Sequence, residues 1–476
     1  MIKDGAKPTK AEIKKLEKKL KSKPPLVWDT LSGKERQNVS KAAEEYKAFL
    51  DAVKTEREAV QEIVAQAESA GFKSLESKGR GHRHYGTLMN KVAALSVRGQ
   101  KPMTKGLRLI ISHIDSPRLD LKPRPLYEDV DLALLKTHYY GGIKKYQWLS
   151  RPLALHGRVI KTDGRSVDVV IGEDDNDPVL TVADLLPHLA GKVQTQKKVS
   201  EAFPGEKLNL LAGSLPLGSD EVKERFKLAI LDILNQRWGL VEDDFISADF
   251  EAVPAGRARD VGLDRGLIGA YGQDDRVCAY TSLTALLKVK NPVHTCVTMF
   301  VDKEEIGSDG ATGAKSKFLE AFVADLLEKA GQASSSAVVR KILMKTKAIS
   351  ADVNGALNPD YQEVHEKMNA ARLGYGPCLT KYTGSGGKYG ASEASAEYMG
   401  WIRGVFQRKK IIWQSGLLGR VDEGGGGTVA MCLAEHAMDI VDCGPALLAM
   451  HAPFEVSSKA DVYMTAKAYQ AFFEAE

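Results

Sequence analysis

The sequence contains little cysteine: only five of its 476 residues are cysteines, and no two of them form a CxxC pair. A cysteine-based structural zinc site is therefore excluded, and an odd, scattered set gives no disulfide framework. Such a set is typical of a reducing compartment, so we expect a cytoplasmic protein. The five are Cys278, Cys296, Cys378, Cys432 and Cys443.

Long apolar runs and an excess of one charge are also missing. No segment approaches the ~18 uninterrupted apolar residues of a membrane span, so we expect no membrane partner. The Lys-rich N-terminus lacks an apolar core and carries Glu12 and Glu17, which does not suit a secretory signal. The net charge of +5, from 67 basic and 62 acidic residues, does not indicate nucleic-acid binding.

Several catalytic motifs are missing as well. The chain has no GxSxG and no HExxH. The stretch from Gly384 to Tyr389 resembles part of a phosphate loop, but Tyr389 replaces the required Ser or Thr, and the run Gly424–Gly427 lacks the lysine. We interpret both as glycine-rich loops that let the backbone approach a substrate.

What the chain does contain is an alternation of apolar strands and helical patterns after residue 262, typical of an α/β domain with a mixed, largely parallel sheet flanked by helices. Residues 126–258 have the texture of strands and turns and suggest an inserted β-rich domain. We predict a discontinuous domain over 1–125 and 259–476 around that insert. The expected helices are 9–22, 35–70, 278–287, 315–331, 392–403 and 429–436, and the expected strands are 107–112, 153–160, 167–171, 296–301, 347–351 and 446–450.

Two adjacent carboxylates, Glu304 and Glu305, follow the apolar run Cys296–Val301. Like charges side by side are costly to bury unless a cation neutralises them. One carboxylate could bind a metal while its neighbour moves a proton on metal-bound water. An exposed acidic pair in a loop is the alternative interpretation, and the rest of the chain must decide.

Other potential ligands also follow apolar runs. In open α/β sheets ligands bind beyond the carboxyl ends of the strands, so these residues could converge on one site. Imidazole and carboxylate without thiolate suit zinc, and also cobalt or manganese. Five ligands fit two metals that share a carboxylate, roughly 3.5–4 Å apart, better than one tetrahedral ion. The further residues are His113, Asp352 and His451 after predicted strands, and Asp274 before a predicted helix.

Taken singly, these residues are weak evidence. A lone histidine at a strand end is more often a hydrogen-bonded core residue, and a lone aspartate is usually a cap or turn residue. Their coincidence favours a site. Asp115, two residues after His113, could accept the free imidazole N–H and fix its tautomer.

These residues lie in motifs that resemble the aspartyl aminopeptidase and vacuolar aminopeptidase I family of dinuclear zinc metallopeptidases, in particular its bacterial aminopeptidase 1 branch. The resemblance covers nearly the whole chain and implies a zinc-exopeptidase-like catalytic domain. The matching stretches are Ser112–Pro117, Gln273–Arg276, Asp302–Ser308, Ser350–Asp352 and Leu448–His451.

The resemblance assigns a role to each residue. It implies that Asp274 bridges two divalent ions and that Glu304 is the general base, with Asp115 as a further catalytic residue. The implied ions are zinc, with cobalt or manganese as alternatives. The implied terminal ligands are His113, Glu305, Asp352 and His451.

The resemblance also implies self-association. The insert resembles the family's dimerisation domain, and the stretch Leu185–Ala190 matches a motif whose histidine, here His188, reaches a neighbouring subunit's active site. A core or interface histidine is the alternative for His188. The family forms homododecamers built from dimers. Lys381 matches a substrate-binding lysine of members selective for acidic residues, but the Gly386–Tyr389 stretch departs from their pattern.

The predicted function is a metal-dependent aminopeptidase that hydrolyses N-terminal residues from peptides, through a dinuclear site with a bridging water and a glutamate base. A related dinuclear hydrolase, such as a deacetylase or carboxypeptidase, is an alternative. A non-catalytic assembly protein of the same fold is a second alternative.

Overall fold

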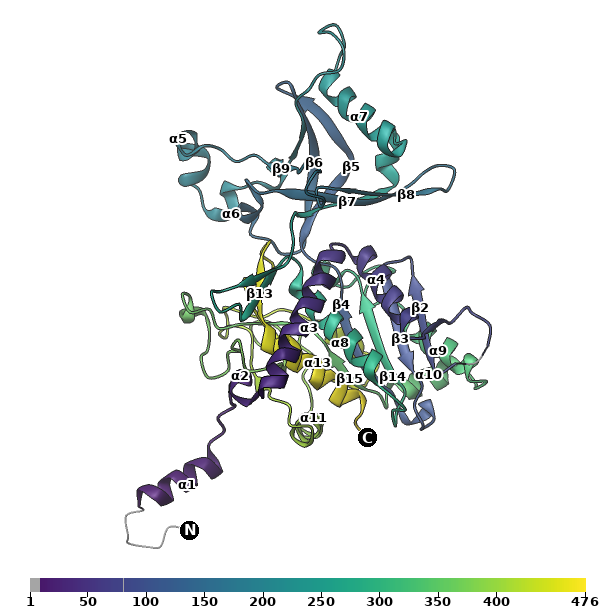
Figure 1. Ribbon diagram of the computed structural model, residues 1–476, viewed down its shortest axis with the longest axis vertical. Helices are drawn as coiled ribbons and strands as arrows, with labels where there is room; N and C mark the ends of the chain where they lie inside the picture. The colour runs from purple at the N-terminus through teal and green to yellow at the C-terminus, as the bar shows by residue number, and fades with distance from the viewer. Residues whose placement is uncertain (1–8, 80) are drawn as a thin grey trace.

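The computed structural model describes residues 9–79 and 81–476. The first eight residues, where no secretory signal was expected, lie outside the described part. The chain forms two lobes, and the middle of the sequence builds the upper one in Figure 1. Within the described part of the chain, no helix is both long and apolar enough to cross a lipid bilayer.

The lower lobe is built on a nine-stranded sheet. Its central strands β14, β4, β15 and β19 are parallel neighbours, and every residue of β4 and β14 is buried. Near-continuous apolar strands are typical of a sheet that is covered on both faces. In spatial order the strands are β1 (Lys73–Ser74), β2 (Arg83–Leu88), β3 (Val92–Val97), β14 (Cys296–Val301), β4 (Arg108–His113), β15 (Lys347–Ser350), β19 (Asp439–Gly444), β17 (Cys378–Thr380) and β18 (Gln414–Ser415).

Helices cover both faces of this sheet. Because side chains alternate along a strand, Ile110 of β4 packs into one buried cluster, while Leu109 and Ile111 pack into another. The first cluster includes residues of α2 (Val27–Thr30), α3 (Gly33–Ala52), α4 (Glu56–Ser69), α8 (Gln273–Lys288), α11 (Ala396–Arg408) and α13 (Lys459–Phe473). The second includes residues of α9 (Phe318–Lys329), α10 (Ser336–Leu343) and α12 (Ala430–Ala434). The predicted mixed, largely parallel sheet flanked by helices is confirmed.

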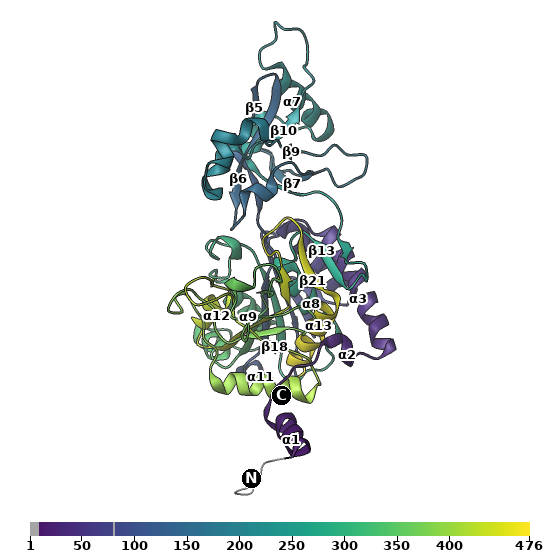
Figure 2. The same ribbon diagram turned by 90° about the vertical axis from the view of Figure 1, so that its left-hand side faces the viewer.

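The first helix, α1 (Lys10–Leu20), stands apart from both lobes (Figures 1 and 2). A capping box between Thr9 and Glu12 starts it, and none of its residues is buried. Its lysines are exposed to solvent.

The upper lobe is a seven-stranded sheet with its own buried core, in which the Trp148 side chain is fully buried. All of its named strand pairs are antiparallel. In spatial order the strands are β8 (Ser166–Ile171), β7 (Leu153–Ile160), β11 (Ala248–Pro254), β5 (Arg118–Asp129), β6 (Leu132–Tyr140), β10 (Leu210–Gly213) and β9 (Thr181–Val182). The first strand thus starts at Arg118, upstream of residue 126. The division of the chain at 126 and 258 stays a prediction.

The predicted β-rich insert is confirmed, but the sequence did not indicate the helices in this lobe. They include the 14-residue helix α7 (Arg225–Trp238) and the short helices α5 (Pro187–Ala190) and α6 (Val199–Ala202). Only Phe226 and Leu234 of α7 are buried, so the apolar stripe that marks a helix in sequence is weak here.

A third, five-stranded sheet lies beside the large one. The strand that precedes His451, β20, belongs to this small sheet and not to the parallel sheet, which the sequence did not indicate. Its order is β12 (Arg259–Val261), β13 (Leu267–Ala270), β21 (Glu455–Ser458), β20 (Ala446–Leu448) and β16 (Asn354–Gly355).

Candidate metal centre

Four of the candidate residues lie at or just after the ends of three adjacent parallel strands. His113 is the last residue of β4 and pairs with Val301, the last residue of β14. Glu304 begins a short 3-10 helix just after β14, and Glu305 is its second residue. Asp352 follows β15. The carboxyl ends of these strands therefore meet at one edge of the sheet, as the sequence suggested.

Asp274 and His451 come from elements other than these three parallel strands. Asp274 lies in the first turn of α8 with non-helical backbone angles, and His451 follows the small-sheet strand β20. Glu455 ties the two together, because its buried carboxylate accepts the backbone N–H of Asp274 at 3.0 Å and that of His451 at 2.7 Å. Glu455 begins strand β21 and carries no ligand motif of its own, so it was not predicted from the sequence.

Asp274 lies between the two histidines. Its Oδ1 is 3.1 Å from Nε2 of His113, and its Oδ2 is 3.3 Å from Nε2 of His451. Glu305 Oε1 is 3.5 Å from His451 Nε2, and Glu304 Oε2 is 3.9 Å from His113 Nε2. One carboxylate thus faces two imidazoles, with a further glutamate beside each ring.

The other ring nitrogens fix the tautomers. Nδ1 of His113 is 3.0 Å from the Asp115 carbonyl oxygen, and Nδ1 of His451 is 2.9 Å from the Gly142 carbonyl oxygen. Because a carbonyl only accepts hydrogen bonds, each Nδ1 carries a proton. In the neutral rings both Nε2 lone pairs then point at carboxylate oxygens, an arrangement that a cation between them would stabilise.

The site also contains buried carboxylates whose negative charge a cation would stabilise. Burial raises the pKa of Asp275, Asp352 and Glu305 well above the usual range, and that of Glu304 to about 7. Three buried carboxylate oxygens at the site accept no hydrogen bond from the described residues: both oxygens of Asp275, and Oε1 of Glu305. Asp275 was not predicted as a site residue, although its position beside Asp274 could have indicated it.

Three groups of these side chains have the spacing of metal ligands, with one atom of each member within 4.8 Å of the others. The donor atoms are imidazole nitrogen and carboxylate oxygen, which suit zinc. The residues present therefore fit a divalent metal. The groups are His113 with Glu304 and Glu305, His113 with Asp275 and Asp352, and Asp274 with Glu305 and His451.

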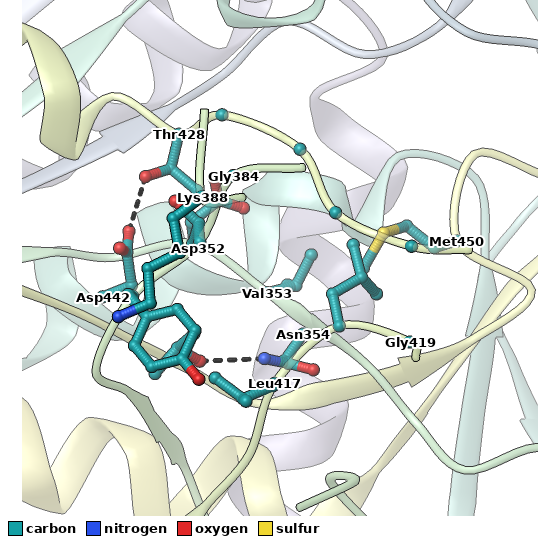
Figure 3. Close-up of a pocket in the computed structure, with 18 of the residues that line it drawn as sticks. Asp352, Val353, Asn354, Gly384, Lys388, Leu417, Gly419, Thr428, Asp442 and Met450 are labelled. Atoms are coloured by element: carbon teal, nitrogen blue, oxygen red, sulfur yellow. Dashed lines mark hydrogen bonds between the residues drawn. The ribbon is translucent and has the colours of Figure 1, made fainter. Parts of the chain in front are cut away.

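A cavity of about 460 Å³ opens onto this centre. Asp352, Asn354, Gly384 and Thr428 are among the residues that line it (Figure 3). The two glycine-rich loops line it and contact each other, because the Gly384 N–H donates to the Gly426 carbonyl at 2.7 Å. The two glycine-rich loops thus form part of the cavity wall beside the candidate ligands.

Two further sequence candidates lie outside this cluster. His188 is exposed on α5 in the upper lobe and does not line the cavity. Lys381 follows β17 between two lining residues, but its own side chain is exposed and its Nζ lies 3.5 Å from Glu393.

Comparisons with known proteins agree with this geometry. The family model described as aminopeptidase I zinc metalloprotease (M18) matches residues 49–473. A probable M18 family aminopeptidase 1 of Clostridium acetobutylicum is 48% identical over 453 residues, which cover 94% of this chain and 97% of that protein. The crystal structure of an M18 aminopeptidase from Thermotoga maritima has a TM-score of 0.92 at 46% identity, and covers 95% of this chain and all of that one.

A more distant structure, that of the yeast mApe1 dodecamer, has a TM-score of 0.74 at 20% identity and covers 92% of this chain and 97% of that one, which shows the shared fold. The Clostridium and Thermotoga proteins are similar over nearly the whole chain, and the family model spans both lobes. This chain therefore belongs to the M18 family of zinc aminopeptidases.

Proposed function

We propose that this aminopeptidase works through two divalent ions, zinc in the first place, that share Asp274 as a bridging ligand. The observation that carries the proposal is the position of Asp274, whose two oxygens lie 3.1 and 3.3 Å from the Nε2 atoms of His113 and His451. A carboxylate placed between two imidazoles could share its two oxygens between two ions, which supports a dinuclear site.

The remaining carboxylates divide between the two histidines. Asp352 has metal-ligand spacing with His113, and Glu305 has it with His451. We assign His113 and Asp352 to one ion and His451 and Glu305 to the other, with Asp274 common to both. Each ion then has one imidazole and one terminal carboxylate, and positions remain for water and substrate.

Glu304 is the proposed general base. The backbone N–H groups of Glu304 and Glu305 both donate to the Asp115 carboxylate at 3.2 Å, which holds the turn that carries the two side chains. Glu304 lines the cavity, and burial raises its pKa to about 7, where a carboxylate can accept and return a proton near neutral pH. When bound, the ions would polarise the scissile carbonyl and acidify the attacking water. Glu304 would take the proton of that water and pass it to the leaving amine.

We also propose that the upper lobe mediates dimerisation and that His188 serves a neighbouring copy's active site. The support is the surface around it, where Leu185, Leu186 and Leu189 are 41%, 50% and 65% exposed. The distant yeast relative is a dodecamer, and we propose the same assembly here. Lys381 stays a candidate for substrate support at the cavity mouth. Measuring the mass of the protein in solution tests the proposed self-association. Measuring the activity of His188→Ala, at a concentration where the protein is assembled, tests the role of His188.

The test of the catalytic proposal is Glu304→Gln, with Asp309→Asn as control. Asp309 lies in the same loop with an exposed side chain that is paired to Lys315. Glu304→Gln should keep two metal ions per chain and lose about 10²–10⁴-fold in kcat on aminoacyl substrates, because the proton transfer is lost. Asp309→Asn should behave as the unaltered protein.

The outcomes separate the alternatives. A Glu304→Gln protein that works at the unaltered rate removes Glu304 as the base. A metal content well under one ion per chain, measured in protein purified without chelator, overturns the dinuclear site. Peptides with an acetylated N-terminus should not be cleaved, since an aminopeptidase recognises the free amine; their cleavage would favour a related dinuclear hydrolase.

A further inference from the structure

The upper lobe contributes residues directly to the metal centre. Its strand β6 ends at Tyr140, and the turn that follows, Gly141–Gly142, runs past the candidate ligands. The Tyr140 side chain is 8% exposed, and its hydroxyl donates to Asp115 Oδ2 at 2.8 Å. Neither the reaction proposed above nor the family match gives this tyrosine a role.

The Asp115 carboxylate is where this contact takes effect. It accepts the backbone N–H of Glu304 on Oδ1 and that of Glu305 on Oδ2, and its Oδ1 lies 3.3 Å from Nδ1 of His113. Asp115 therefore orients a ligand histidine and the glutamate turn at once. The Tyr140 hydroxyl fixes the rotation of that carboxylate from the opposite lobe.

The residues after Tyr140 touch the other half of the site. The Gly142 carbonyl accepts the Nδ1 proton of His451 at 2.9 Å. At Gly141, where φ is +73°, an added Cβ would lie 3.2 Å from Glu305 Oε2, so a side chain here would be strained and would crowd Glu305. One tripeptide of the upper lobe thus contacts both sides of the candidate metal centre.

Tyr140 is itself held in place. The Arg118 guanidinium lies 3.9 Å from the centre of its ring. Arg118 in turn pairs with Asp120 at 2.7 Å and with Glu251 at 3.1 Å. A hydroxyl on a ring fixed in this way can impose one orientation on Asp115.

We propose that Tyr140 is a positioning residue, which acts through Asp115 on His113 and so sets the metal affinity and the alignment of the site. The inference rests on the metal centre proposed above. A residue that hydrogen-bonds to the partner of a metal-binding histidine supports the ligand's orientation and basicity. The simpler alternative is that Tyr140 only packs at the junction of the lobes.

The test compares Tyr140→Phe with Tyr139→Phe. The first keeps the ring over Arg118 and removes only the hydroxyl, and the second removes a hydroxyl from the neighbouring exposed tyrosine, which does not contact the site. Zinc affinity is measured by competition with a chelator on the purified, metal-loaded proteins, beside kcat, KM and the thermal midpoint. We expect Tyr140→Phe to bind zinc about 10–100-fold more weakly and, at saturating zinc, to lower kcat with KM nearly unchanged.

A second comparison shows whether the effect passes through Asp115. If it does, Asp115→Ala combined with Tyr140→Phe loses no more zinc affinity than Asp115→Ala alone. Zinc affinity of Tyr140→Phe within twofold of Tyr139→Phe, with or without a lower thermal midpoint, would overturn the positioning role. That result leaves the metal centre intact, whereas failure of the unaltered protein to bind zinc would overturn the proposed function itself.

Discussion

Raising the pH above neutrality should loosen the contact between the two lobes through one histidine. His156 of β7 lies in the upper lobe and is 4% exposed. Its Nδ1 is 2.7 Å from Glu58 of α4 in the lower lobe, and its Nε2 is 3.2 Å from Glu173. A protonated imidazole between two carboxylates donates to both, and deprotonation removes one of these hydrogen bonds.

The pKa of His156 gives the size of the effect. Burial lowers this pKa, but the hydrogen bonds to Glu173 and Glu58 outweigh burial and raise it from 6.5 to about 9. A folded-state pKa above the unfolded value stabilises the fold fully below pH 6.5, and this contribution is lost as the pH rises through 9. At 1.36 kcal/mol per pKa unit the contribution is about 3 kcal/mol.

The assay is the thermal midpoint of unfolding between pH 6 and pH 10, for the unaltered protein, His156→Gln and the control His138→Gln. His138 is exposed on β6 of the same lobe. The unaltered protein should exceed His156→Gln by the widest margin at pH 6, and the margin should close by pH 10, while His138→Gln follows the unaltered protein throughout. A margin that is constant across this range would contradict a role for the His156 charge, because an uncharged packing role does not depend on pH.

Two further substitutions test the junction and the metal centre. Glu56→Gln should destabilise the protein by about 3–5 kcal/mol in thermal or urea unfolding. The reason is that the Glu56 carboxylate is fully buried, 2.7 Å from a lysine Nζ and 3.6 Å from an arginine Nη. Glu62→Gln, on the same helix, is the control and should change the stability little. Gly444→Ala should reduce the zinc content and kcat together, because the added Cβ would lie 2.1 Å from the Asp352 carbonyl oxygen. The control is Gly400→Ala, where an added Cβ meets open space. Equal zinc content in the two variants would contradict the prediction.

The central strands could be predicted because their signal is local. Cys296–Val301 is apolar except for Thr298, and the structure has β14 at those bounds. The strand predicted over 347–351 is β15, one residue shorter. Parallel strands buried on both faces are mostly apolar along their length, so the sequence marks them directly, and the residues at their ends become candidates without further knowledge.

Other features depend on contacts between distant segments, which no local pattern reveals. His451 follows a short apolar run like the other candidates, yet its strand belongs to a different sheet, and Glu455 is what brings it to Asp274. The helix α7 buries only two residues, so its sequence resembles an exposed segment. Tyr140 reaches Asp115 from 25 positions along the chain, across the boundary between the lobes.

The junction between the lobes shares its side chains with the metal centre. Arg118 of β5 pairs with Glu56 of the lower lobe and with Glu251 of β11, and it also stacks on Tyr140. Buried charges are costly unless each meets its partner in good geometry, so such a junction disfavours displaced arrangements of the lobes. Since Tyr140 in turn holds Asp115, the docking of the upper lobe and the orientation of His113 depend on one set of contacts. We infer that the insert has a role within its own subunit, in addition to the proposed dimerisation.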